Sequence, residues 1–410
     1  MPLLSLFSEH VEELCLAFLA SFILCGTLVA TRHLHLHKTT RNEDLSAVQA
    51  MHAMPVPRVA GLCIFAAIIL TAAMLIPDAE RDLTLLLLMS AAPTFFAGLL
   101  EDLGWRVSVR GRLVSAAASA LLAIILLEVW IPTFHLPGLA LITSIAPFAI
   151  GLTVLWSAGV CHAFNLIDGT NGLCGTISAM VAVALAMIAM ASGVDHLAPL
   201  AAITAAALLG FLVLNWPAGL IFMGDAGAYA IGHILVWIAI LLAWQDPSIS
   251  PIALSLLFFW PVADTFLAMW RRLARGTSIG QPDKLHFHQL VMRAILISIP
   301  GMPLRRANAM TALCVIPFAS MPIISGITLV REPGMALLAW AFFGVLFILT
   351  YLSGMRFFRR QAHRGRNVSR CASAAGHAAV PVPERDHAEG TTQSGFQLQV
   401  PDTADAAQDR

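Results

Sequence analysis

Residues 196–214 read HLAPLAAITAAALLGFLVL, a run that contains no Asp, Glu, Lys or Arg. Such a run is long enough for a helix to cross a bilayer core, which takes roughly 20 apolar residues. The same character extends outward: 58% of the 410 residues are hydrophobic and 12% are charged, against about 25% charged in soluble domains. The sequence predicts an all-α, polytopic integral membrane protein. We expect about eleven transmembrane helices, at 14–31, 58–76, 82–100, 113–131, 137–157, 173–192, 196–214, 226–244, 251–270, 309–330 and 334–354.

Basic residues lie almost wholly on one side of these expected spans. One side holds 22 of the 24 Lys and Arg residues. Because cytoplasmic loops are enriched in Lys and Arg, we expect the N-terminus outside and the C-terminus in the cytoplasm. The 24 basic and 24 acidic residues cancel, so net charge gives no reason to expect nucleic-acid binding. The basic segments are 32–58, 101–112, 271–306 and 356–410.

The C-terminal segment 356–410 differs in composition from the rest. It begins with arginines that suit the anionic cytoplasmic leaflet, and continues with Ala, Gly, Pro, Gln, Ser and Asp. Such a segment has too little apolar surface to form a core. We therefore expect a transmembrane domain at 1–355, with catalytic loops in the cytoplasm, and a disordered cytoplasmic tail at 356–410.

Acidic residues in glycine-rich sequence recur at the cytoplasmic ends of the expected spans. Acids at membrane depth are costly and usually face a bundle interior or a wet cavity, and glycine lets the backbone approach a ligand closely. Several such groups at one face predict a common site. The alternative is that each acid caps a helix or lies in a solvated loop. The groups are Glu101-Asp102, Asp168, Asp225, Asp264 and the segment Pro282 to His288.

Phosphoryl transfer is the chemistry that suits these carboxylates. Mg²⁺ is typically held by one or two carboxylates and by substrate phosphates, and nearby cations offset charge on the transferred group. We expect Mg²⁺, with Mn²⁺ as the alternative ion, beside cations such as Arg112 and Lys284. The pair His286 and His288 leaves a zinc site as a rival interpretation, although no cysteine lies nearby.

Five motifs in order resemble those of the polyprenyl-phosphate N-acetylhexosamine-1-phosphate transferases, glycosyltransferase family 4, in the branch of undecaprenyl-phosphate GlcNAc-1-phosphate transferases. The resemblance covers about residues 45–305. The motifs are Pro55-Val-Pro-Arg-Val-Ala-Gly61, Glu101-Asp102 with Arg110 and Arg112, Asn165 to Gly172, Phe222 to Gly227, and Asp264 with Arg271-Arg272 and Asp283 to His288. Three positions depart from the family pattern. Glu101 and Asn171 stand where the family usually has aspartates, and Gln289 stands where a further histidine is frequent. The lost charge at Asn171 points to a divergent branch or to an impaired chain.

The resemblance implies transfer of an N-acetylhexosamine 1-phosphate from a UDP-sugar to undecaprenyl phosphate, with release of UMP, at the bacterial inner membrane. This reaction would start a lipid-linked cell-surface polysaccharide, such as lipopolysaccharide O-antigen or a cell-wall polymer. By the same resemblance, Asp225 binds the metal with help from Asp168, and Glu101 and Asp102 position or deprotonate the acceptor phosphate. The residues implied to bind the nucleotide sugar and its phosphates are Asn165, Asp168, Asn171, Arg112, Asp264, Lys284, His286 and His288.

Two other functions stay open at this stage. A proton-coupled transporter or lipid flippase would place its charged groups near the bilayer midplane, whereas here only Asp264 falls within an expected span. A catalytically inactive protein that binds a sugar nucleotide is the second, and Asn171 is the argument for it. A homodimer is also left open.

Overall fold

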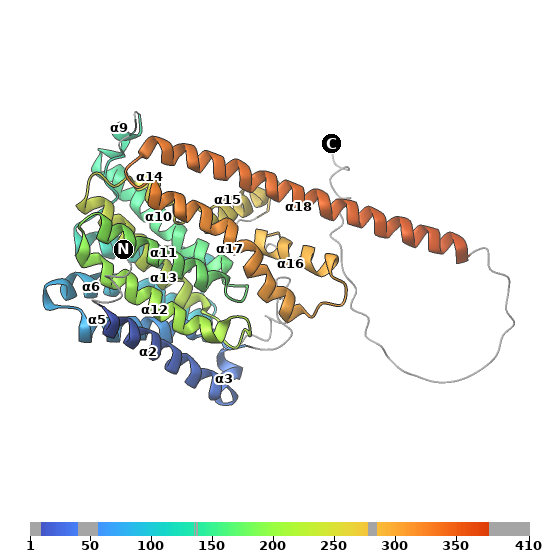
Figure 1. The fold of residues 1–410 in the computed structure, drawn as a ribbon, viewed down its shortest axis with the longest axis horizontal. Coiled ribbons are helices and arrows are strands. Elements are labelled where there is room, and N and C mark those ends of the chain that lie inside the picture. The colour runs from blue at the N-terminus through green and yellow to red at the C-terminus, as the bar shows by residue number, and fades with distance from the viewer. Residues whose placement is uncertain (1–9, 40–55, 135, 137, 278–284, 377–410) are drawn as a thin grey trace. The chain divides into compact units, whose positions relative to one another are not determined.

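The computed structural model describes residues 10–39, 56–134, 136, 138–277 and 285–376. Over these ranges the chain is helical and contains no strand, which confirms the all-α prediction (Figure 1). The helices are α2 (Val11–Ala30), α3 (Arg32–Thr39), α5 (Ala60–Leu75), α6 (Asp78–Ser90), α7 (Ala92–Asp102), α8 (Val109–Leu127), α9 (Leu139–Thr143), α10 (Ala146–Ile167), α11 (Leu173–Ala191), the 3₁₀ turn η1 (Asp195–Leu197), α12 (Ala198–Asn215), α13 (Gly224–Gln245), α14 (Pro251–Leu256), α15 (Phe259–Ala274), α16 (Phe287–Ser298), α17 (Leu304–Thr328) and α18 (Pro333–Gly376).

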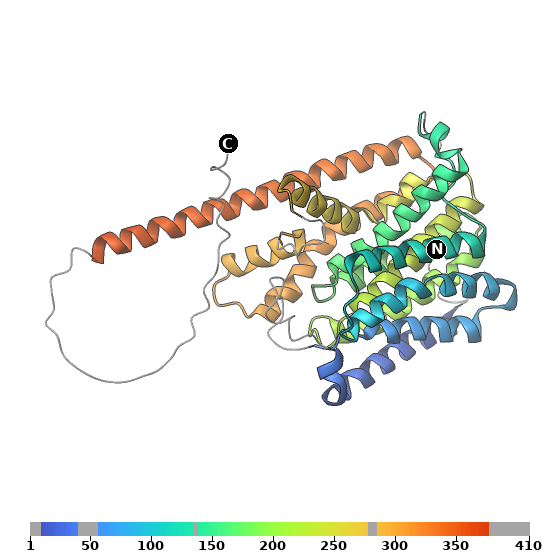
Figure 2. The ribbon, with the colours of Figure 1, turned by 180° about the vertical axis from the view of Figure 1, so that it is seen from behind.

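The chain divides into two units, Met1–Phe347 and Ile348–Arg410. In the first unit, α9 lies at one end of the helix bundle and α3 and α16 lie at the other (Figures 1 and 2). In the second unit, α18 continues to Gly376. The helix therefore occupies the first part of the segment that we expected to be disordered from residue 356. The remainder of that segment lies outside the described residues.

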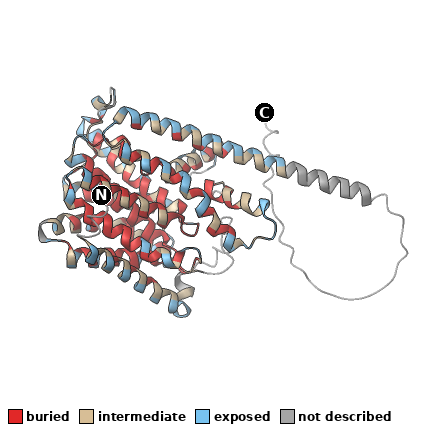
Figure 3. Cartoon of the chain, viewed as in Figure 1, coloured by how far each residue is buried: buried red, intermediate tan, exposed pale blue. Residues whose placement is uncertain are grey.

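Helix α13 is the centre of the first unit. It packs against α5, α7, α10 and α11, and its whole apolar stretch is buried, as the red interior of Figure 3 shows. A helix that is apolar on all sides is expected to be buried. Within a bilayer, close packing rather than the hydrophobic effect holds helices together, and small residues allow it. At Gly61 of α5, for example, a Cβ atom would lie 2.2 Å from the backbone nitrogen of Gly227.

The described helices support a polytopic membrane protein. Eight of them are long and apolar enough to cross a membrane, or nine if the bent pair α6–α7 counts as one span. Large apolar side chains such as Ile125 and Leu155 are more than two-thirds exposed, as lipid-facing residues should be. The count of eleven stays a prediction, because α5 has 16 residues and the run at 251–270 forms two helices, α14 and α15.

The expected span at 137–157 was wrong in its boundaries. Helix α10 begins at Ala146, with Pro147 in its first turn, and ends at Ile167. Proline is well tolerated there, because the first N–H groups of a helix have no partner within it. The helix therefore runs ten residues past the expected end of the span, and Asp168 follows its last residue directly.

Candidate active site

The chain that leads into α13 lies against the chain that leads into α5. Three backbone hydrogen bonds of 2.8–3.1 Å join the segment Pro57–Gly61 to Phe222 and Met223. Gly224 follows with φ +76°, and a Cβ atom at this position would lie 2.0 Å from the carbonyl oxygen of Arg58. Only glycine combines this positive φ with so close a backbone approach. The position of the first turn of α13 is thus set by backbone contacts.

Two acidic side chains from other segments cap the N-terminus of α13. The carboxylate of Asp102, at the end of α7, accepts hydrogen bonds from the backbone N–H groups of Asp225 and Ala226, both at 2.9 Å. The carboxylate of Asp168, after α10, accepts one from the N–H of Gly224, also at 2.9 Å. The first N–H groups of a helix need such acceptors, and the helix dipole favours negative charge there. Three of the predicted acids therefore meet at one helix end.

Two arginines lie beside these acids. Arg58 approaches one carboxylate oxygen of Asp225 at 3.5 Å, and Arg112 approaches the other, also at 3.5 Å. Arg112 also lies 3.8 Å from a carboxylate oxygen of Glu101. Glu101 and Asp225 are both buried. Arg112 therefore links the acid at the end of α7 to the acid at the start of α13.

The acidic cluster, which consists of Glu101, Asp102, Asp168, Asp225, Arg58 and Arg112, has an excess of negative charge. Its four carboxylates and two guanidinium groups give a formal charge of −2. Burial raises the pKa of Asp168 to about 7, because little water reaches this carboxylate. A single divalent cation would balance the excess.

The donor set of the acidic cluster fits Mg²⁺ in kind. Carboxylate oxygens are the ligands that Mg²⁺ prefers, and it commonly takes only one or two from the protein, with waters and substrate phosphates completing the octahedron. The backbone hydrogen bond of Asp168 involves Oδ2 only. The two oxygens of Asp225 lie 3.5 Å from the guanidinium groups of Arg58 and Arg112. No group of three or more His, Cys, Asp or Glu side chains suited to a metal occurs among the described residues.

Two polar side chains on the last turns of α10 lie near the acidic cluster. His162 donates from Nδ1 to the carbonyl of Ala158 (2.9 Å), and its ring lies 5.0 Å from that of Tyr229. Its Nε2, and the Nδ2 of Asn165, are buried without a hydrogen-bond partner among the described residues. A buried N–H without an acceptor is costly. Nδ2 of Asn165 is therefore a donor suited to a bound ligand.

Asn171 is fully buried and bonds to α17 and to the loop before α13. Its backbone N–H donates to Oδ1 of Asn308 (2.8 Å), and its Nδ2 donates to the carbonyl of Pro217 (3.2 Å). A carboxylate at this position could not make the second bond, because it has no proton to donate. The asparagine thus serves the packing of this chain and is turned toward Pro217.

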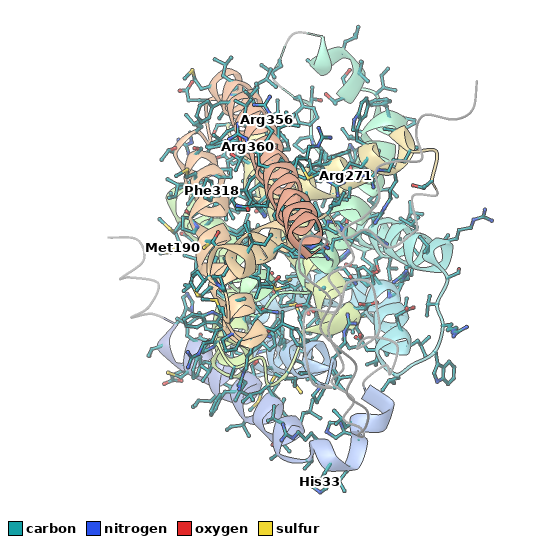
Figure 4. All side chains as sticks on the ribbon, turned by 90° about the vertical axis from the view of Figure 1, so that its right-hand side faces the viewer. His33, Met190, Arg271, Phe318, Arg356 and Arg360 are labelled. Atoms are coloured by element: carbon teal, nitrogen blue, oxygen red, sulfur yellow. The ribbon has the colours of Figure 1, made fainter. Side chains whose placement is uncertain are left out.

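Asp264 contacts a different set of residues. Its Oδ2 lies 3.2 Å from Nδ1 of His286 and 3.7 Å from Nδ1 of His288, and its Oδ1 accepts from the backbone N–H of Phe287 (3.1 Å). All three side chains are almost completely buried. Asp264 thus fixes the start of α16 and orients the two histidines. Figure 4 looks at this end of the bundle and labels Arg271, on the same helix as Asp264.

The structure therefore brings together four of the predicted acids with Arg112, and places Asp264, His286 and His288 in a second cluster. Lys284 lies outside the described residues. Sequence reasoning gave no role to Arg58, His162 or Tyr229. Arg58 had a signal, as the one basic residue of the proline-rich segment before α5. The other two are visible only from the packing of α10 against α13.

Comparison with known proteins points to the same region. A profile of glycosyl transferase family 4 matches residues 84–243. The undecaprenyl-phosphate alpha-N-acetylglucosaminyl 1-phosphate transferase of Escherichia coli (strain K12) is 29% identical over 284 residues, which are 67% of this chain and 74% of the relative. The enzyme of the same name from Salmonella typhi is 29% identical over 312 residues, 73% of this chain and 79% of the relative. A probable undecaprenyl-phosphate N-acetylglucosaminyl 1-phosphate transferase of Bacillus subtilis (strain 168) is 27% identical over 250 residues, 61% of this chain and 69% of the relative.

The matched region contains the whole of α7, α8 and α10 and all but the last two residues of α13, and with them all four carboxylates of the acidic cluster. Three of the five sequence motifs lie within this region, namely those at Glu101–Arg112, Asn165–Gly172 and Phe222–Gly227. Residues 84–243 therefore match glycosyl transferase family 4, and the chain is similar to the undecaprenyl-phosphate N-acetylglucosaminyl 1-phosphate transferases named above.

Proposed function

We propose that this protein transfers an N-acetylhexosamine 1-phosphate from a UDP-sugar to undecaprenyl phosphate and releases UMP. The observation that carries the proposal is the acidic cluster at the start of α13, where Asp102 and Asp168 accept backbone hydrogen bonds and two guanidinium groups pair with Asp225 and Glu101. Phosphoryl transfer depends mainly on positioning and on charge stabilisation. A rigid cluster of fixed charges provides both the positioning and the charge stabilisation.

In this reaction an oxygen of the lipid phosphate attacks the β-phosphorus of the UDP-sugar. The bond between that phosphorus and the oxygen bridging to the α-phosphorus breaks, and UMP leaves with the electron pair. Arg58 and Arg112 offset the negative charge of the phosphates, and Glu101 holds Arg112 in place. Asp102 holds the start of α13 and thereby Asp225. Asn165 offers its buried N–H to the nucleotide sugar.

Asp225, with Asp168 as second ligand, would hold Mg²⁺ or Mn²⁺. When bound, the ion neutralises diphosphate oxygens and increases the electrophilicity of the phosphorus. The excess negative charge of the acidic cluster and the raised pKa of Asp168 support this assignment. His286 and His288, oriented by Asp264, are proposed to contact the leaving nucleotide.

The site belongs at the cytoplasmic face of the bacterial inner membrane. A polyprenyl tail stays in the bilayer and a UDP-sugar stays in water, so the two can meet only at the boundary. The basic residues of the loops favour this face as the cytoplasmic one. We propose an external N-terminus and a cytoplasmic C-terminus on the same grounds.

The contacts of Asn171 favour an active enzyme over an inactive sugar-nucleotide-binding protein. The lost carboxylate at this position is the main sequence argument for inactivity. Asn171, however, donates its hydrogen bond to Pro217. The bonds of Asp102 and Asp168 to the start of α13 do not involve Asn171. The departure from the family pattern therefore leaves the acidic cluster intact.

The test is UMP release by purified protein in detergent with undecaprenyl phosphate, Mg²⁺ and a panel of UDP-sugars, UDP-GlcNAc first. We expect EDTA and Asp225→Asn each to abolish release. Asp246→Asn is the matched control, because it changes an aspartate about 30 Å away at the other end of α13. It should leave activity unchanged.

Two outcomes would count against the proposal. UMP release by none of the UDP-sugars would remove the transferase assignment, and full activity in the Asp225→Asn protein would remove the metal assignment. The sugar that gives the highest kcat/KM identifies the donor. Its lipid product, given to downstream glycosyltransferases, tests whether the pathway is that of O-antigen or of a cell-wall polymer.

A further inference from the structure

The membrane span made of α6 and α7 is bent by 45° at Ala91. Pro93, in the first turn of α7, has no N–H to donate to the carbonyl of Met89, as proline never has. The N–H of Ala91 bonds to Leu88, three residues back, rather than four. A bend in a membrane helix frees backbone groups that other side chains must satisfy. The side chains that do so here decide how well the bend is fixed.

His233 of α13 and Ser90 of α6 form the first contact at the bend. The hydroxyl of Ser90 donates to the carbonyl of Leu87 (2.7 Å), and Nε2 of His233 lies 2.8 Å from the same hydroxyl oxygen. Because the proton of Ser90 is already used, His233 must be the donor. This assigns the neutral ring with its proton on Nε2. The chain of hydrogen bonds runs from α13 through Ser90 to the backbone at the bend.

A second contact comes from α8. The N–H of Thr94, which in a straight helix would bond to the carbonyl of Ser90, donates instead to Oγ of Ser119 (2.9 Å). Ser90, Thr94 and Ser119 are all buried. The bend is therefore held from two sides, by α13 and by α8.

The proposed reaction gives His233 no role. It is fully buried, and it lies eight residues, or about 12 Å, along α13 from Asp225. Its Nδ1 has no hydrogen-bond partner among the described residues. A polar side chain inside a membrane bundle is costly and generally retained for a function.

Helices α7 and α13 meet again at the acidic cluster. Asp102 caps α13 there. Between the two contacts, Gly98 lies so close to α13 that a Cβ atom would be 2.5 Å from the nitrogen of Ala226. Helix α13 thus bonds to the last residue of α6, before the bend, and to the last residue of α7, and it packs closely against the backbone of α7 between them.

We infer that His233 is a positioning residue of the transferase: through Ser90 it fixes the α6–α7 bend, and so holds Glu101 and Asp102 in register with the start of α13. The inference rests on the proposed function for its activity readout. The direction of α7 after the bend sets where its last residues lie. A small displacement at the bend therefore also displaces Glu101 and Asp102 at the other end of α7.

The experiment compares three variants of the full-length protein in detergent. His233→Gln keeps an N–H about where Nε2 lies, His233→Asn places its N–H near the position of Nδ1, and His233→Leu has none. We expect His233→Gln to keep kcat within about threefold, and the other two to lower kcat about 10- to 100-fold with little change in KM, because a misplacement of about 1 Å costs that much. Hydrogen exchange across α7 should quicken in His233→Leu and stay unchanged across α12.

Ser90→Ala provides a second variant if His233→Leu does not fold. Adding His233→Asn to Ser90→Ala should cost nothing further, because the two residues act through one contact. Unchanged kcat in His233→Asn and His233→Leu overturns the inference, and so does faster exchange with unchanged kcat. Wild-type protein that releases no UMP overturns the proposed function instead, while the exchange comparison still tests the bend.

Discussion

Replacing Asp102 by alanine removes the acceptor of two backbone N–H groups at the start of α13, both bonded at 2.9 Å. A hydrogen bond to a charged group contributes about 1.5–3 kcal/mol, so the gross loss is about 3–6 kcal/mol. The substitution also removes the repulsion between this carboxylate and Asp225 and the cost of burying its charge, which offset part of the loss. We expect a net loss of about 2–4 kcal/mol in the free energy of unfolding.

Asp225→Asn is the informative comparison. Asp225 adds negative charge to a cluster that already has an excess, and its ion pairs are long, at 3.5 Å. Its replacement should change stability by about 1 kcal/mol or less, while abolishing UMP release. The assay is thermal unfolding in detergent with EDTA, followed by tryptophan fluorescence. The reasoning is refuted if Asp102→Ala unfolds at the wild-type temperature, or if Asp225→Asn unfolds earlier than Asp102→Ala.

Three further outcomes are expected. Gly98→Ala should force α7 away from α13 and lower kcat at least about tenfold. Gly151→Ala should leave kcat unchanged, because a Cβ atom there meets nothing within 4 Å. Equal kcat values for the two variants would contradict the packing argument. The pKa of Asp168 is raised to about 7 from an ordinary 3.8, so between these pH values the folded state keeps a proton that the unfolded state releases. Metal-free protein should therefore lose stability as the pH rises toward 7. Asp168→Asn should remove this part of the pH dependence of thermal unfolding, and an unaltered pH profile would contradict the argument. Asp264→Ala leaves the imidazole of His286 and the backbone N–H of Phe287 without their acceptor and removes the charge that lies 3.7 Å from Nδ1 of His288. Hydrogen exchange across α16 should therefore quicken; unchanged exchange would show that another contact holds this helix.

The gathering of acids was predictable from the sequence, because each acid follows or precedes an apolar run on the same side of the membrane. Asp168 and Asp225 were marked further by flanking glycines. At Gly224 the structure gives the reason, a positive φ and a carbonyl oxygen within contact distance. The all-α membrane fold followed from hydropathy alone.

The particular partner of each side chain was not predictable. Both oxygens of Asp102 turn to backbone N–H groups of a helix more than 120 residues later, and no local pattern encodes such a pairing. Asn171 looked like a lost charge, but its bond to Pro217 depends on a loop 46 residues away. Hydropathy also missed where α10 begins, because an apolar run continues on both sides of Pro147.

The enclosure of α13 restricts how a lipid can reach Asp225. Since neighbouring helices bury α13 along its apolar stretch, a lipid phosphate that approaches Asp225 comes end-on to the first turn of the helix, and its chain lies against the surrounding helices. Most contacts between the protein and the acceptor then fall near the phosphate, so truncated acceptors of a few units should serve nearly as well as the full-length carrier.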